Sequence, residues 1–197
     1  MTVSQKTLTL IVKPDEFQKM TDDILQFLHH NDLRAEAKDR DNPRLKAFRR
    51  NIYFPELLFR LDLTGHRDER FLIKVESQDQ LVHYKPEIVN IKGCGFFFPM
   101  PVPSNEVLCA MKVSAMLNRQ KGRDFYDAMF LLSQTLPDFT FLKERSGISN
   151  LEELKQKASG IFKNIDLKNK MKDFEHLLFN KNNSVKILHA QVFFDEL

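Results

Sequence analysis

A short stretch of this chain gathers residues that could hold a strongly charged anion. It contains four basic side chains and two carboxylates: Lys112, Arg119, Lys121, Arg123, Asp124 and Asp127. Lys112 and Arg119 are seven residues apart, so on a helix they lie on nearly the same line. Arginine can bind phosphate oxygens through two parallel hydrogen bonds. We call the four cations the basic corner, and their spacing predicts a site for a polyphosphate.

Two helices must meet to position this corner. Gly122 is expected to end the first helix, because glycine adopts the left-handed cap conformation at little cost. Asp124 is then expected to cap the second helix, and Asp127 to reach back to it in a variant of the capping box. The alternative is a solvated helical hairpin, in which the cations only complement a helix dipole and an Arg123–Asp127 pair contributes about 0.3 to 0.5 kcal/mol. The spacing alone leaves both interpretations open.

A second set of chemically useful residues lies in the first half of the chain. Residues 57–63 and 71–77 alternate apolar and charged side chains, which is the period of half-buried strands. Paired as a hairpin, they would place four charges on one face: Arg60, Asp62, Lys74 and Glu76. That face is interpreted either as a row of cross-strand ion pairs or as the wall of a nucleotide cleft.

Motifs in both regions resemble those of a known family. Residues 104–112 read S-x-E-x-x-x-A-x-K, and residues 121–127 read K-x-R-D-x-Y-D, with Ala115 and Arg119 between them. These motifs resemble the signature of the AbiEii/AbiGii family, nucleotidyltransferase-like toxins of bacterial toxin–antitoxin and abortive-infection systems. The sequence I-K-V-E-S is similar to the family's Lys-x-Glu motif, which carries over to Lys74 and Glu76. The resemblance covers residues 7–133.

The resemblance implies transfer of a nucleotide from a nucleoside triphosphate to an acceptor such as tRNA or another RNA, with a cognate antitoxin protein as a further partner. Such a reaction requires Mg²⁺, which takes oxygen ligands. Glu76 and Asp62 are the expected metal or base carboxylates, and Lys74 is the third expected catalytic residue. The basic corner, with Asp124 and Asp127, is expected to hold the triphosphate. The mechanism requires the charged face and the basic corner to open onto one hollow.

One expected feature of the family is replaced in this chain. The Asp-x-Asp pair that supplies the main metal ligands falls at Thr7-Leu8-Thr9, and no glycine precedes Gly65. Neutral hydroxyls cannot replace two carboxylates at a magnesium site. The hypotheses are therefore an active transferase whose chain lacks an upstream segment, and a degenerate module that binds nucleotide, RNA or an antitoxin. A third hypothesis, a structural helical protein, predicts no salt-sensitive binding to nucleotide or RNA.

The predicted fold class is α+β: a nucleotidyltransferase-like mixed sheet with flanking helices, followed by a C-terminal helical bundle. Predicted elements are a strand from residue 7, a helix over 14–30, two strands around a turn at 39–43, and helices over 124–134, 150–162 and 167–179. The tail 185–194 is either a strand or a helix. Residues 80–103 show no period, which predicts domains at 1–101 and 102–197.

The composition of the chain argues against several other classes of protein. The 197 residues carry a net charge of only +3, which argues against a general nucleic-acid coat protein. A basic run at Arg44, Lys46, Arg49 and Arg50 is interpreted as a solvated strand face or as an RNA contact. Two cysteines are too few for a disulfide framework, and no apolar run approaches the ~20 residues needed to span a bilayer. We expect a cytoplasmic protein without a membrane partner.

Overall fold

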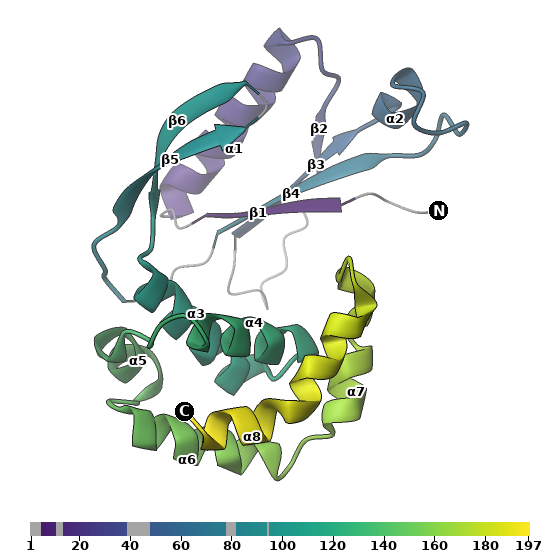
Figure 1. Ribbon diagram of the computed structural model, residues 1–197. Helices are drawn as coiled ribbons and strands as arrows, with labels where there is room; N and C mark the ends of the chain where they lie inside the picture. Colours follow the sequence, from purple (N-terminus) through teal and green to yellow (C-terminus); the bar gives the residue numbers. More distant parts are fainter. Residues whose placement is uncertain (1–4, 11–13, 39–47, 78–81, 94) are drawn as a thin grey trace. The chain divides into compact units, whose positions relative to one another are not determined.

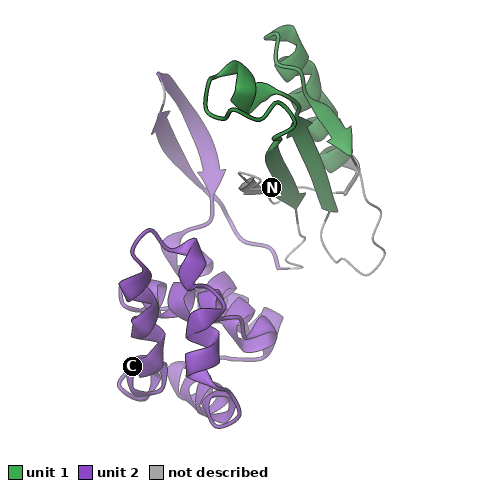
Figure 2. Cartoon of the chain, turned by 90° about the vertical axis from the view of Figure 1, so that its right-hand side faces the viewer, with its two compact units in different colours: residues 1–80 green, residues 81–197 purple. Residues whose placement is uncertain are grey.

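The computed structural model describes residues 5–10, 14–38, 48–77, 82–93 and 95–197. The chain divides into two compact units, Met1–Gln80 and Leu81–Leu197 (Figure 2). Each unit is described by itself below. The fold class predicted from the sequence, α+β, is confirmed, and the domain boundary predicted at residue 101 stays a prediction.

Unit 1 is a four-stranded mixed sheet with one long helix. Its strands are β1 (Gln5–Leu10), β2 (Glu36–Lys38), β3 (Phe48–Phe54) and β4 (Phe71–Ser77), in the order β1-β4-β3-β2 (Figure 1). β1 runs parallel to β4, whereas β3 is antiparallel to both β4 and β2. The helix α1 (Pro14–His30) connects β1 to β2 and confirms the predicted helix over the same residues. β4 therefore lies in the interior of the sheet.

The core of unit 1 forms where α1 packs on one face of the sheet. Phe17 of α1 is buried with Ile52 and Phe54 of β3 and with Val75 of β4. Apolar residues one turn apart on α1, and alternate residues on the strands, are thereby removed from water, as their periods predict. Arg50 also ties β3 to α1, since its Nη1 donates to Thr21 Oγ1 at 3.2 Å and lies 2.8 Å from Asp22 Oδ1.

The predicted strand at residues 57–63 is wrong. After Pro55 the chain forms a short helix α2 (Leu57–Arg60), and Leu61 and Leu63 are 58% and 70% exposed. The reason is the register of the sheet, in which Phe54 at the end of β3 lies opposite Phe71 at the start of β4. Residues 55–70 must therefore return the chain through a connection. β3, not residues 57–63, is the antiparallel partner of β4.

The segment predicted to be irregular, 80–103, contains a β-hairpin. β5 (Glu87–Gly93) pairs antiparallel with β6 (Phe96–Val102), and Gly95 in the turn has a φ of 82°. Pro99 and Pro101 are two residues apart, so both of their missing N–H groups fall on the same side of β6. Prolines are tolerated in a strand when that side does not face its partner. The alternating prolines therefore end no strand here, and the sequence-based interpretation was wrong.

The rest of unit 2 is a group of helices around one core. They are α3 (Asn105–Arg119), α4 (Gly122–Leu132), α5 (Phe139–Ser146), α6 (Leu151–Phe162), α7 (Leu167–Lys172) and α8 (Ala190–Asp195), with 3-10 turns η1 (Glu175–Leu177) and η2 (Lys181–His189) before α8. Ser104, Asp138, Asn150 and Asp166 cap the starts of α3, α5, α6 and α7. The predicted helix over 150–162 is confirmed, the one over 167–179 is shorter, and the tail is helical. Phe125, Met116, Leu154 and Phe194 meet in the core.

No helix in the described part of the chain has the length and apolar character needed to cross a bilayer.

Gly122 allows an unusually close approach between α4 and α7. A Cβ at this position would lie 1.8 Å from the carbonyl oxygen of Lys170 and 2.3 Å from Asp173 Oδ1. The backbone N–H of Gly122 donates to the Asp173 carboxylate, with distances of 3.1 and 3.2 Å to its two oxygens. Asp173 thus supplies negative charge at the N-terminus of α4, where the helix dipole favours it.

We expect Gly122→Ala to lower the free energy of unfolding by about 1 to 3 kcal/mol or more, because a backbone carbonyl must move to admit the methyl group. Gly160→Ala is the matched control, since Gly160 lies within α6 and a methyl group added there would meet no other atom within 4 Å. That change should raise stability by up to about 1 kcal/mol. Urea unfolding followed by far-ultraviolet circular dichroism measures both, and equal effects of the two changes would contradict the close approach.

Candidate functional site

The basic corner lies between α3 and α4, but its turn differs from the prediction. Gln120, with a φ of 52°, adopts the left-handed conformation that ends α3. Lys121 is the extended N-cap of α4, and Gly122 is the first helical residue. The predicted roles of Gly122 as the end of α3 and of Asp124 as the N-cap were therefore wrong. Asp124 is instead the third residue of α4, and its carboxylate accepts a hydrogen bond from the Lys121 N–H at 3.3 Å.

Two aspartates hold most of the corner's cations. Asp127 Oδ2 accepts a hydrogen bond from Lys112 Nζ at 2.8 Å and lies 3.4 Å from Arg123 Nε. The predicted Arg123–Asp127 pair is thus confirmed. Asp124 Oδ1 accepts from Arg119 Nη2 at 2.5 Å. The prediction that Asp127 reaches back to Asp124 gains no support from these contacts, because Asp127 binds a lysine on the neighbouring helix instead.

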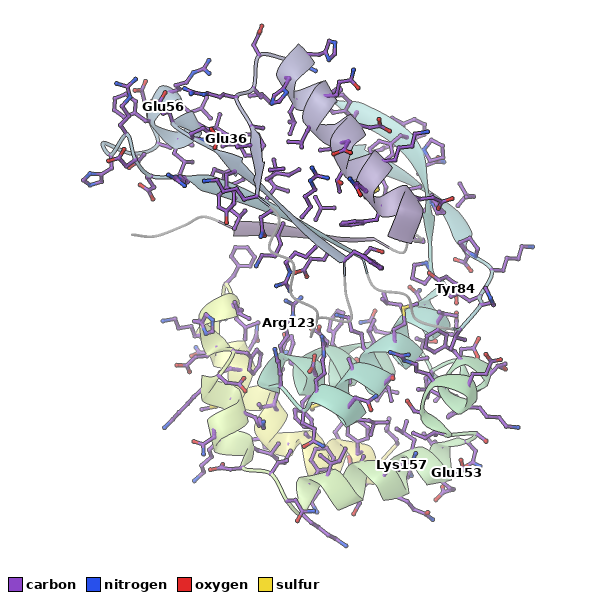
Figure 3. The ribbon with its side chains drawn as sticks, turned by 180° about the vertical axis from the view of Figure 1, so that it is seen from behind. Glu36, Glu56, Tyr84, Arg123, Glu153 and Lys157 are labelled. Carbon is purple, nitrogen blue, oxygen red and sulfur yellow. The ribbon has the colours of Figure 1, made fainter. Side chains whose placement is uncertain are left out.

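The corner nevertheless keeps positive charge at the surface of unit 2. The side chains of Arg119 and Arg123 are 56% and 62% exposed, and no ion pair of Lys121 is seen within the described residues. Figure 3 shows Arg123 projecting from the start of α4. Four cations face two carboxylates, so the exposed members remain able to contact an anion. Lys112, by contrast, is largely occupied in joining α3 to α4.

The register of unit 1 defines a second charged surface. Residues directly opposite each other on paired strands share one face of a sheet. Lys38, Asn51 and Lys74 lie opposite one another on β2, β3 and β4, and Thr7 of β1 is the register partner of Lys74. In the next row Arg49 lies opposite Glu76, whose partner on β1 is Thr9. We call this surface the polar sheet face, and it also includes Glu36 and Tyr53.

Glu76 forms an ion pair with Arg49 across the strands. Their side chains are 21% and 36% exposed, so the pair is partly shielded from water. In the other row, the Lys38 Nζ lies 5.8 Å from the centre of the Tyr53 ring, within range of a cation–π contact. Asn51 Oδ1 is buried and accepts no hydrogen bond from the described residues. The predicted polar face thus exists around Lys74 and Glu76, but with β3 as its partner strand.

Asp62 does not belong to this face. It follows α2 in the connection between β3 and β4, where its φ is 54°. The position derived for Asp62 beside Lys74 was therefore wrong, because residues 57–63 form no strand. Of the predicted basic run, Arg49 and Arg50 lie on β3 and face opposite sides of the sheet, while Arg44 and Lys46 lie outside the described residues.

The residues around Glu76 do not fit a magnesium site. No Asp or Glu precedes Asp15 in the sequence, so β1 has no carboxylate, and β3 has none either. Among the described residues, no three His, Cys, Asp or Glu side chains are grouped closely enough to hold a metal ion. Glu76 also has a cationic partner already. Mg²⁺ is commonly held by one or two carboxylates together with water and substrate phosphates, and the one carboxylate on these strands is already paired with an arginine.

Cys109 is a core residue and no nucleophile. It is fully buried in unit 2, and burial together with the nearby Glu106 charge raises the pKa of its thiol to about 12. The thiol lies 3.8 Å from the Thr135 carbonyl oxygen, to which it donates. Because the thiolate is the reactive form, the raised pKa leaves the Cys109 thiol protonated and unreactive near neutral pH.

The structure thus combines a Lys-x-Glu strand inside a mixed sheet with a helical unit that carries the K-x-R-D-x-Y-D corner, as the resemblance to nucleotidyltransferase-like toxins predicts. The family described as nucleotidyl transferase AbiEii toxin, type IV toxin–antitoxin system, matches residues 10–180, and the chain belongs to this family. No curated protein and no solved structure matches the chain. The matched range includes both the polar sheet face on β3 and β4 and the basic corner.

Sequence reasoning missed two residues that determine the surroundings of these sites. Arg49 was seen only as part of a basic run, since its pairing with Glu76 depends on which strand lies beside β4. Asp173 was missed because it is 51 residues from Gly122 along the chain. Both are contacts between distant segments, and no local spacing indicates them.

We expect Asp124→Ala to lower the free energy of unfolding by about 1 to 3 kcal/mol, because it removes a buried carboxylate that accepts from both Arg119 and the Lys121 N–H. Asp127→Ala is the control on the same helix. Its carboxylate is 23% exposed, and the loss should be at most about 1 kcal/mol and should shrink in high salt. Urea unfolding at two salt concentrations compares them, and a larger loss for Asp127→Ala would contradict this assignment.

We also expect Cys109 to resist alkylation in the folded protein. In a Cys94→Ser variant, iodoacetamide should modify Cys109 at a rate that rises as the pH approaches 12 or when urea unfolds the chain. Because the pKa of the Cys109 thiol is higher in the folded protein than in the unfolded chain, the unfolded chain loses this proton first. The free energy of unfolding should therefore fall as the pH rises from the ordinary thiol pKa to about 12. Mass spectrometry after timed labelling measures the rate. Rapid modification at pH 8 without denaturant would contradict the burial.

Proposed function

We propose that this protein is a toxin-family member that binds a nucleoside triphosphate on the polar sheet face, without the carboxylates needed for metal-dependent transfer. The observation on which the proposal rests is the group of three cations around Glu76. Lys38, Arg49 and Lys74 share this face, and the ion pair with Arg49 already neutralises Glu76. A triphosphate is the anion that such a group suits, since arginine and lysine bind phosphate oxygens through charge-assisted hydrogen bonds.

The neighbouring side chains also suit a nucleotide. The ring of Tyr53 lies on the polar sheet face two residues from Asn51 and can stack on a base, a contact that contributes about 1 to 3 kcal/mol in other proteins. Asn51 lies between Lys38 and Lys74 in the same row of this face, so its side chain adds no charge that would oppose a phosphate.

The basic corner is the second proposed phosphate-binding group. Lys121 is exposed, and Arg119 and Arg123 are exposed although each is paired with an aspartate, so all three side chains can contact a triphosphate or the phosphates of an RNA. Lys112 and Asp127 join the two helices that carry them. The hypothesis that the polar sheet face and the basic corner open onto one hollow stays a prediction. Binding measurements with variants of each group test it directly.

Transfer of a nucleoside monophosphate to an acceptor such as tRNA is the second candidate function. It is favoured by family membership and by the Lys74-x-Glu76 motif on the central strand β4. In that case Glu76 would act as the base or metal carboxylate, Lys74 would hold phosphate, and Mg²⁺ would be required. Glu76 would then have to give up its ion pair with Arg49, and no second carboxylate on β1 or β3 would assist it.

Membership of a type IV toxin–antitoxin family also supports a cognate antitoxin as a functional partner. A toxin is expected to slow bacterial growth when it is expressed alone. A partner gene would then be identified by restored growth, and Lys74→Ala should relieve the inhibition if the polar sheet face carries the activity.

The expected outcome is nucleotide binding without RNA labelling. Calorimetry should detect binding of a nucleoside triphosphate to the whole chain, weakened about tenfold by Lys74→Ala and to a smaller extent by Arg123→Ala, since each removes one phosphate contact. Incubation with each labelled nucleoside triphosphate, Mg²⁺ and total RNA should leave the RNA unlabelled.

Glu76→Gln separates the two candidate functions. If the chain transfers nucleotides, RNA becomes labelled and this change abolishes the label. If the chain only binds, Glu76→Gln does not weaken binding, because it removes a carboxylate and leaves the cations in place. Absence of binding together with absence of labelling would refute both candidates.

A further inference from the structure

The polar sheet face differs from a metal-dependent phosphate site in the sign of the charge around its glutamate. In register, Glu76 has Arg49 on one side and the neutral Thr9 position on the other. The row beside it contains Lys38 and Lys74, with Asn51 between them. The other carboxylate of this face, Glu36, lies on the edge strand β2, opposite Tyr53.

A divalent cation would be poorly placed at this face. Two unit charges of like sign about 5 Å apart repel each other by roughly 3 kcal/mol at an effective dielectric constant of 20. A Mg²⁺ ion bound at Glu76 would lie beside Arg49 and within reach of Lys74, and it would also have to displace the Arg49 guanidinium from the carboxylate. Binding of the ion would form one contact between Mg²⁺ and a carboxylate, and it would break the existing ion pair between Arg49 and Glu76.

An unmetallated triphosphate is better matched to the same residues. Free nucleoside triphosphate carries more negative charge at neutral pH than its magnesium complex, because the bound ion neutralises part of the phosphate charge. Arg49 has five N–H donors, so it can retain Glu76 and still donate to a phosphate oxygen. Lys38 and Lys74 lie two strands apart, about 10 Å, on either side of Asn51. That spacing allows both lysines to reach the two ends of a triphosphate chain.

We propose that Arg49, together with Lys38 and Lys74, takes the place of a metal ion, so that this face binds nucleoside triphosphate in its metal-free form and Mg²⁺ opposes the binding. The proposal rests on the proposed function, since it concerns the same face. It reverses the metal dependence that the transferase chemistry of the fold would require. The protein then recognises the fraction of nucleotide that is not complexed with magnesium.

The test is calorimetric titration of the whole chain with ATP, once in EDTA and once in excess Mg²⁺. We expect the affinity to be about three- to tenfold higher in EDTA, because the free nucleotide brings more charge to the three cations. Arg49→Ala should weaken binding in EDTA and should reduce the opposing effect of Mg²⁺, since Glu76 then becomes available to the ion while Lys38 and Lys74 remain. Glu76→Gln should strengthen binding in EDTA, because Arg49 is released for phosphate.

Arg67→Ala is the matched control. Arg67 is an arginine of the same unit, is 71% exposed and is also paired with a glutamate, Glu56, at 2.8 Å, but it lies in the connection between α2 and β4. Its removal should leave both affinities unchanged. Circular dichroism of each variant separates a lost contact from a lost fold.

The outcomes distinguish this inference from the proposed function. Tighter binding in EDTA that depends on Arg49 supports both. Binding that needs Mg²⁺ and is lost in EDTA overturns the inference and leaves nucleotide binding intact. Absence of ATP binding in both buffers, or binding of RNA alone, overturns the inference and the proposed function together.

Discussion

The interior position of β4 determines the surroundings of every charged residue on the sheet of unit 1. β4 is flanked by β1 on one side and β3 on the other, so its residues 72–77 each have two register partners. For Glu76 those partners are Thr9 and Arg49, and for Lys74 they are Thr7 and Asn51. A shift of one residue would exchange the core and polar faces of β4, moving Val75 out of the core. The apolar packing against α1 thereby also fixes which charges meet.

The K-x-R-D-x-Y-D motif shows how residues that suit a ligand can also hold a fold together. Asp124 is buried and accepts hydrogen bonds from Arg119 and the Lys121 N–H, while Asp127 joins Lys112 of α3 to α4. These contacts tie the two helices to each other and to the turn between them. Arg119, Lys121 and Arg123 nevertheless remain exposed, so they can contact an anion while the two carboxylates keep the turn in place. The structural interpretation of the motif therefore applies to Asp124 and Asp127, and the anion-binding interpretation applies to Lys121 and Arg123.

Local patterns in the sequence predicted several of the longer helices and strands. The helix over 14–30, the strand over 71–77 and the helix over 150–162 are each long enough for their apolar period to be recognised. Residues 57–63 have the same alternation as a strand, but Pro55 and the 54–71 register leave them in a connection. The β5–β6 hairpin was missed for the opposite reason, since Pro99 and Pro101 suggest a break although both are tolerated on one side of β6.

The candidate site required information that no local pattern contains. Lys74 and Glu76 could be named from their motif, but Arg49 and Lys38 join them only through strand pairing, and Asp62 leaves the group for the same reason. That exchange changes the chemistry of the face. A second carboxylate beside Glu76 would have made a cation the natural occupant, whereas an arginine in the same place leaves a group of cations whose mutual repulsion only an anion relieves. The identity of one cross-strand neighbour therefore decides whether this face attracts a metal ion or a phosphate.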